Sequence, residues 1–274
     1  MRTKLMLGIL AMSSLSLFSC SQEDEAINEN SMQTAASRTA ATSVEEIDFY
    51  YKGEHYQTVS YILNDSIIGI ENPEIERLLA SLNELPNLVI FAYPDGSCEY
   101  FDDYESFQAE KNRVFSFSEE VEKWYVQNPG TMPRGSVDVP NAGANRENIA
   151  NLFLHDDRNY EDTRVEFDLK KGQGKIEIPH LKAYGMNDKT TSFCAFTMQG
   201  TKNLFELFED DNYRSHCFSF LVTMTTHIGM NNGEKAAIEP HGAFCCPNLK
   251  NIHVTGTKKS SWNDRITSIR ITQQ

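Results

Sequence analysis

Apolar and polar residues alternate in short runs through the second half of the chain. Residues 164–169 read Arg-Val-Glu-Phe-Asp-Leu, and residues 217–222 read Cys-Phe-Ser-Phe-Leu-Val. Alternation at every second position, bounded by glycine, asparagine and aspartate, is typical of half-buried antiparallel strands. No apolar stripe at helical spacing is evident after about residue 150. The pattern therefore predicts an all-β fold for this half.

Residues 44–125 carry a different pattern. Two alternating runs at residues 47–51 and 54–61 meet at Lys52-Gly53, which predicts a β-hairpin. Residues 73–82 begin with proline and carry apolar side chains at helical spacing, so they predict a helix. The other expected elements are a second hairpin over residues 87–101 and helices over residues 103–108 and 119–124. The order ββαββα indicates a small α+β domain with helices on one face of a sheet.

One hexapeptide occurs twice. Residues 187–192 read Asn-Asp-Lys-Thr-Thr-Ser, and residues 263–268 read Asn-Asp-Arg-Ile-Thr-Ser. An acidic turn that ends in Asn-Tyr precedes each copy, at residues 156–160 and 209–213. Each copy offers side-chain oxygens of the kind that hard cations such as calcium prefer. Two corresponding copies indicate a duplicated unit with paired sites, and the longer second interval predicts an insertion around residues 224–244.

These residues make the second half resemble the βγ-crystallin family of double Greek-key domains. The hexapeptide is intact twice, Phe208 and Tyr213 have the aromatic spacing of the family's first hairpin, and residues 261–271 are similar to the end of such domains. The resemblance covers residues 147–274. It implies an all-β double Greek-key sandwich, with one key at about residues 147–198 and the other at about residues 199–274.

Three positions depart from the family pattern. The glycine that usually follows the hairpin aromatics is Asp162 in the first unit and Ser215 in the second. Glycine is used there for a backbone conformation that other residues reach at a cost. His155 stands where the first unit would have an aromatic residue.

The resemblance implies two calcium sites, built crosswise between the two hexapeptides. The implied ligands are the Thr191 and Thr267 hydroxyls, the Lys189 and Arg265 backbone carbonyls, the Asp188 and Asp264 carboxylates, each reaching the site of the other motif, and a backbone carbonyl near Asp156 or Glu209. Asn187, Ser192, Asn263 and Ser268 complete the two motifs. One carboxylate per ion predicts weak sites, with dissociation constants on the order of 10⁻⁴ to 10⁻³ M. The alternative is a pair of metal-free turns whose Thr and Ser hydroxyls cap the backbone.

Residues 1–19 have the pattern of a secretory signal. Two basic residues precede an apolar run over residues 5–18 that is too short to span a bilayer. Cys20 follows and resembles the lipid-modified first residue of a bacterial lipoprotein. The acidic residues after it resemble the signal that sends lipoproteins of the Bacteroidetes to the outer face of the outer membrane. We therefore expect a surface-exposed lipoprotein with a flexible tether over residues 20–43.

Charge narrows the classes of partner. The formal net charge is −14 and the pI is about 4.9. A nucleic acid backbone would be repelled, so no nucleic acid partner is expected. The expected partners are the outer membrane through the lipid on Cys20, calcium, and an unidentified protein or glycan ligand. The expected domains are the α+β domain at residues 44–125, a Pro/Gly-rich linker at 126–146 and the Greek-key domain at 147–274.

Cysteine usage leaves more than one reading. Five of the six cysteines follow Cys20, an odd number, so at least one thiol stays unpaired. A bridge from Cys217 to Cys245 or Cys246 within the second unit is one possible pairing, and the sequence leaves the pairing open. The histidines near Cys245 and Cys246 match no zinc pattern.

No catalytic motif is present in the sequence. His216 directly precedes Cys217, but neighbours on a strand point to opposite faces, so the pair is not expected to react together. The expected function is a non-catalytic, calcium-stabilised binding module at the cell surface. The alternatives are a protease inhibitor that presents a loop from residues 224–244, with Gly229, Gly233 and Gly242, and a carbohydrate-binding or adhesion module.

Overall fold

The computed structural model describes residues 43–63, 66–128, 147–162, 164–198, 200–223, 227–228, 241–249, 252 and 261–274. The expected signal and lipidation site lie outside these residues, as do residues 129–146 of the expected linker and most of the expected insertion, whereas residues 126–127 of that linker belong to a helix. Within the described ranges, no helix has both the length and the apolar character needed to cross a membrane.

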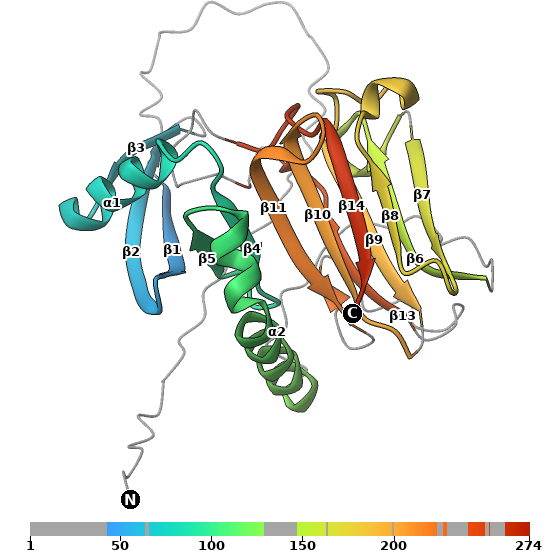
Figure 1. The fold of residues 1–274 in the computed structure, drawn as a ribbon. Coiled ribbons are helices and arrows are strands. Elements are labelled where there is room, and N and C mark those ends of the chain that lie inside the picture. The colour runs from blue at the N-terminus through green and yellow to red at the C-terminus, as the bar shows by residue number, and fades with distance from the viewer. Residues whose placement is uncertain are drawn as a thin grey trace, which may run out of the picture. The chain divides into compact units, whose positions relative to one another are not determined.

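Strands from both halves of the chain form one nine-stranded sheet (Figure 1). In spatial order its strands are β3 (Ser66–Ile70), β2 (Glu54–Leu63), β1 (Ser43–Tyr51), β5 (Cys98–Phe101), β4 (Val89–Ala92), β11 (Arg214–Val222), β10 (Asn203–Asp210), β14 (Ser268–Gln273) and β8 (Lys175–Ile178). The halves meet where β4 runs parallel to β11, with Val89 opposite Cys217 and Ala92 opposite Phe220. The expected domain limits stay predictions, but the sheet is continuous across them.

A second sheet of five strands belongs to residues 147–274. In spatial order its strands are β12 (His227–Ile228), β13 (His241–Cys246), β9 (Ser192–Met198), β6 (Asn148–His155) and β7 (Arg164–Lys170). In each unit the fourth strand lies beside the first, as in a Greek key: β9 pairs with β6, and β14 pairs with β10. The third strands are exchanged, because β8 pairs with β14 and β13 pairs with β9. The all-β, Greek-key prediction is therefore confirmed for the described residues.

The first half differs from its predicted order. The strand β3 precedes the helix α1 (Pro73–Asn83), so the order is βββαββα and the predicted ββαββα domain is not confirmed. The two short helices expected over residues 103–108 and 119–124 are one helix, α2 (Tyr104–Gln127). The alternating Val-Phe-Ser-Phe-Ser at residues 114–118 hides this helix in the sequence. The Asp103 carboxylate accepts a hydrogen bond from Ser106 N (2.8 Å), near the start of the helix.

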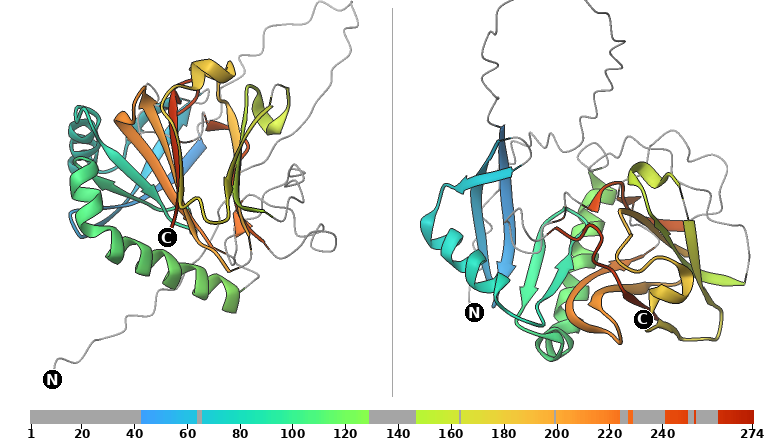
Figure 2. Two further views of the ribbon diagram at one scale, coloured as in Figure 1. Left: turned by 45° about the vertical axis from the view of Figure 1, so that its right-hand side comes forward. Right: turned by 90° about the horizontal axis from the view of Figure 1, so that it is seen from above.

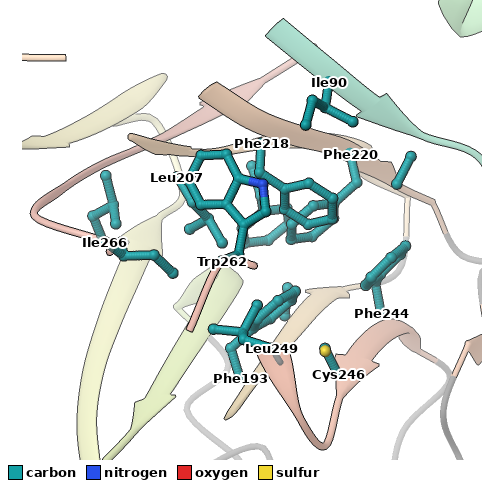
Figure 3. Close-up of a cluster of buried hydrophobic side chains, with 14 of the residues drawn as sticks. Ile90, Phe193, Leu207, Phe218, Phe220, Phe244, Cys246, Leu249, Trp262 and Ile266 are labelled. Atoms are coloured by element: carbon teal, nitrogen blue, oxygen red, sulfur yellow. The ribbon is translucent and has the colours of Figure 1, made fainter. Parts of the chain in front are cut away.

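The main core lies between the two sheets. Its aromatic centre contains stacked pairs whose ring centroids are 4.4 Å apart for Phe220 and Phe244 and 5.3 Å apart for Phe193 and Phe220. Trp262 packs beside Phe218 in the same cluster (Figure 3). Buried residues of α1 belong to this core too, so α1 and the five-stranded sheet cover the same face of the large sheet.

A second core lies on the opposite face of the nine-stranded sheet. Buried α2 side chains, including Phe107 and Val114, pack there against β4, β10 and β11. Figure 2 shows the helix α2 on the side of the large sheet away from the five-stranded sheet. A third, smaller cluster on the outer face of the five-stranded sheet holds Phe153, Tyr160, Cys194, Phe196, Ala243 and Cys245. Alternation along each strand divides apolar residues between these layers.

Candidate metal centre

Each hexapeptide ends in a serine whose side chain forms two hydrogen bonds with the backbone of the acidic turn in its own unit. In the first unit, Ser192 Oγ donates to Asp157 O (2.6 Å) and accepts from Tyr160 N (3.1 Å). The same two bonds recur in the second unit at Ser268, Asp210 and Tyr213, with distances of 2.7 and 3.1 Å. In the first unit, the bonded part of the acidic turn includes a short 3-10 turn (Arg158–Tyr160). The sequence duplication is therefore a structural duplication.

The two residues that stand in place of the family's glycines adopt the backbone conformation for which glycine is used. Asp162 has a φ of 58° and Ser215 a φ of 64°, so both adopt the left-handed conformation that glycine reaches more easily. His155 takes the place of the expected aromatic: its ring centroid lies 5.9 Å from that of Tyr160, edge to face. Burial, with a contribution from the Arg164 charge, lowers the pKa of His155 to about 4, so the ring packs as a neutral aromatic at pH 7.

The two hexapeptides are bonded to each other through the backbone. Asp188 N donates to Ile266 O (3.3 Å), and Asp264 N donates to Thr190 O (3.1 Å). Both aspartates have a left-handed φ, 51° for Asp188 and 55° for Asp264. This exchange of equivalent bonds brings the second residue of each motif to the other motif.

Three different oxygen types converge at Thr191. Its Oγ1 lies 3.4 Å from Lys189 O and 3.3 Å from Asp264 Oδ1. The Asp264 carboxylate comes from the other hexapeptide, so the crosswise reach implied by the resemblance is present here. A hydroxyl, a carbonyl and a carboxylate are a donor set that suits calcium, whose oxygen ligands lie about 2.3–2.6 Å from the ion. The residues present therefore fit calcium at this position, which we name the Thr191 site.

The equivalent position around Thr267, named the Thr267 site, is assembled less completely. Thr267 Oγ1 donates to Glu209 O (2.9 Å), which joins the hexapeptide hydroxyl to the acidic turn. Within the described part of the chain, no hydrogen bond links Asp188 to Thr267. Burial, followed by the negative charges of Asp211 and Asp210, raises the pKa of Asp188. A cation held here would relieve that repulsion.

The side chain of Glu209 has different partners from its backbone carbonyl. It accepts a hydrogen bond from Arg265 Nε (2.9 Å) and contacts His216 Nδ1 (2.5 Å), while His216 Nε2 contacts Leu85 O (2.8 Å). Burial acts to raise the pKa of Glu209, but the bonds from His216 and Arg265 outweigh it and lower the pKa. Since Arg265 neutralises this carboxylate, Glu209 offers the Thr267 site its backbone oxygen. The sequence did not reveal the contact between His216 and Leu85, because these two residues are 131 positions apart in the chain.

The Thr267 site opens on the surface. A pocket of about 390 Å³ is lined by Asn187, Asp210, Asp211, Arg214 and Thr267, and so draws on both motifs. Asp156, expected to supply a carbonyl to the Thr191 site, has its carboxylate 4.0 Å from Lys189 Nζ. Among the described residues there is no group of three or more His, Cys, Asp or Glu side chains suited to a metal. The candidate sites depend on hydroxyls and carbonyls as well, which makes them a different kind of centre.

Two possibilities raised by the sequence do not fit the described residues. Cys217 packs in the core under α2, whereas Cys245 faces outward from the five-stranded sheet and Cys246 lies between the sheets. A bridge from Cys217 to either cysteine would have to cross a sheet. Gly242, expected in an inhibitory loop, lies in β13 opposite Thr197. The rest of that loop, residues 224–226 and 229–240, falls outside the described ranges.

Comparison with known proteins gives similarity at the level of structure only. No family model matches this chain, and no curated protein matches it. A βγ-crystallin from Ciona intestinalis is similar over 45% of this chain and 99% of its own, with 15% identity and a TM-score of 0.25. A mutant of a βγ-crystallin domain from Clostridium beijerinckii is similar over 44% of this chain and 95% of its own, with 17% identity and a TM-score of 0.22. At these scores, the Greek-key assignment depends on the strand order described above.

Proposed function

We propose that residues 147–274 are a βγ-crystallin-like domain that binds calcium and is stabilised by it, within a non-catalytic binding protein. The observation that carries this proposal is the convergence of Thr191 Oγ1, Lys189 O and Asp264 Oδ1, with separations of 3.3 and 3.4 Å. The carboxylate comes from one Greek key and the other two oxygens from the other. An ion held there would join the two keys directly.

Stabilisation follows from mass action. A ligand that binds the folded state alone raises the free energy of unfolding by about 2.7 kcal/mol when its concentration is 100 times its dissociation constant. The three oxygens come together only in the folded chain, because Asp264 is far from Thr191 in sequence. The Thr191 site is the stronger candidate, since the Asp264 carboxylate lies 3.3 Å from the Thr191 hydroxyl, whereas among the described residues Asp188 makes no hydrogen bond to Thr267.

Calcium titration tests this proposal. Addition of 10 mM calcium, about 100 times a dissociation constant near 10⁻⁴ M, is expected to raise the melting temperature by about 5–10 °C. Asp264→Asn, which removes the charge and keeps the shape, should remove most of that rise. Lys189→Ala is the matched control, because Lys189 contributes only its backbone carbonyl.

Scanning calorimetry with calcium and with magnesium checks the result. Magnesium demands a tighter octahedral geometry and should stabilise the domain far less. An equal rise in melting temperature with both ions, or a rise that persists in Asp264→Asn, would show only general charge screening of an acidic protein. Either result would contradict the proposal.

The proposed location is the outer membrane, facing the medium, with a lipid on Cys20 as the anchor. The apolar run before Cys20 and the acidic residues after it support this assignment. Weak sites suit an exported protein, because calcium outside cells is abundant enough to fill them. We expect the full-length protein to fractionate with membranes and Cys20→Ser to lose its lipid, as measured by labelled palmitate incorporation. Equal labelling of the two would refute lipidation at Cys20.

A further inference from the structure

Two of the buried cysteines face each other across neighbouring strands. Cys194 on β9 lies directly opposite Cys245 on β13 in an antiparallel pair. Their side chains share the outer face of the five-stranded sheet, in the same small cluster as Tyr160 and Phe153. Cys194 is 0% exposed and Cys245 is 3% exposed. The strand register therefore holds the two thiols together.

The geometry of such a pair suits a disulfide. Directly opposite residues of antiparallel strands have Cα atoms about 4.5 or 5.5 Å apart, depending on the type of pair. Both values fall within the range of about 4.4–6.8 Å seen for disulfides.

The other described cysteines lie elsewhere. Cys246 follows Cys245 and so points to the opposite face, into the core between the sheets, where its sulfur is drawn in Figure 3. Cys217 packs under α2, and Cys98 packs against the main core. Of these five, only Cys194 and Cys245 share a cluster and directly opposite positions on paired strands.

We propose that Cys194 and Cys245 form a disulfide that links the two Greek keys. Each thiol loses its hydrogen as the Sγ–Sγ bond forms. The two electrons and the two protons pass to an external disulfide, a small molecule or a protein, whose own S–S bond breaks to give two thiols. Because β9 closes the first key and β13 is the exchanged strand of the second, the bond ties the exchanged strand in place.

The surroundings of the pair decide when the bond forms. Burial, together with contact from the Cys245 thiol, raises the pKa of Cys194. The reactive thiolate is therefore scarce once the protein has folded, and the oxidant has little access. The disulfide forms as β9 and β13 come together during folding. It then stabilises the protein mainly by closing a long loop in the unfolded chain.

Peptide mapping tests the pairing. The full chain is refolded with oxidised glutathione, alkylated and digested with trypsin without reduction. We expect residues 190–202, which contain Cys194, to be joined to residues 236–250, which contain Cys245 and Cys246. Cys246→Ser should keep this link and Cys245→Ser should lose it. Reduction of the unsubstituted protein should lower its melting temperature by about 5–15 °C, a measurement that does not depend on the folding of any variant.

Other patterns overturn the proposal. These are a link that persists in Cys245→Ser, a bond between Cys245 and Cys246, and unlinked peptides after refolding with oxidant. An unchanged melting temperature on reduction would also count against a disulfide that ties the two keys. Calcium is absent from all of these arms, so the result is independent of the calcium proposal.

Discussion

Replacing Arg270 by alanine is expected to lower the free energy of unfolding by about 3–5 kcal/mol, because it leaves a buried charge without its partner. Arg270 on β14 lies 3.5 Å from the carboxylate of Glu206, whose residue is 1% exposed. It also bonds Glu177 (3.0 Å) and the hydroxyl of Tyr104 on α2 (2.9 Å). One side chain thus joins three strands to the helix of the first half.

The aromatic surroundings of Arg270 add to this loss. Its guanidinium lies 4.6 Å from the ring centroid of Tyr213, 5.3 Å from that of Phe208 and 5.6 Å from that of Tyr104. Lysine keeps the charge but has no planar group that can stack on the rings and hydrogen-bond at the same time. Arg270→Lys should therefore lower the free energy of unfolding by less than Arg270→Ala does.

The loss in Arg270→Ala should depend on pH and on Glu206. Burial raises the pKa of Glu206, and Arg270 opposes that rise. Without Arg270, the folded-state pKa of Glu206 lies further above the unfolded-state value. The resulting loss of stability is therefore full above the folded-state pKa, declines as pH falls from the folded-state to the unfolded-state pKa, and is absent below the unfolded-state pKa. Urea denaturation at several pH values measures this. The double variant Glu206→Gln, Arg270→Ala should recover much of the stability at pH 7; no recovery would show that the ion pair is not the cause.

Trp262→Ala is expected to lower the free energy of unfolding by about 3–5 kcal/mol, the usual loss when a large buried aromatic side chain is truncated. Trp262 is 1% exposed, and its ring centroid lies 5.8 Å from that of Phe218. Figure 3 shows its ring enclosed by core side chains that include Leu207 and Ile266. Removing the ring would leave a cavity at the centre of the sandwich.

Trp262→Phe is the matched control. Among the described residues, buried Trp262 Nε1 has no hydrogen-bond partner, so phenylalanine removes an N–H that makes no hydrogen bond there and removes less volume than alanine does. Its loss should stay below about 2 kcal/mol. Unfolding in urea should be followed by circular dichroism and not by tryptophan fluorescence. Both variants lack Trp262, and the fluorescence of the other tryptophan, Trp124, which is 48% exposed, would report on α2 instead of the core. A loss below about 1 kcal/mol for the alanine variant would contradict this account of the core.

Trp262 also bears on the calcium proposal. It directly precedes Asn263 and Asp264, and its backbone N donates to Ile252 O (3.0 Å). The ring fixes the start of the hexapeptide whose carboxylate reaches Thr191. Trp262→Ala should therefore reduce the calcium-dependent rise in melting temperature as well as the overall stability.

Local sequence chemistry explains why some features were predictable. The Lys52-Gly53 turn joins β1 to β2 as expected, with left-handed φ values of 52° and 79°, because turn residues act on their own neighbours. The α1 helix begins after Asn72, whose side chain accepts from Glu74 N, a cap that needs no distant partner. Both ends of the helix α2 were predicted, but its continuity was not, because its central residues alternate and burial against the nine-stranded sheet overrides that pattern.

The sequence by itself determined the strands of the second half, the duplicated turns and the oxygen ligands that the hexapeptides offer. Period-two alternation and the hexapeptide chemistry are properties of residues close together in the chain. The reach of Asp264 to Thr191 was implied by the family resemblance and is present in the structure. Only the tertiary structure decided that β4 continues the sheet beside β11 and that Cys194 faces Cys245. Both depend on pairing between segments that are distant in the chain, and the register of such pairs follows from packing of the whole core.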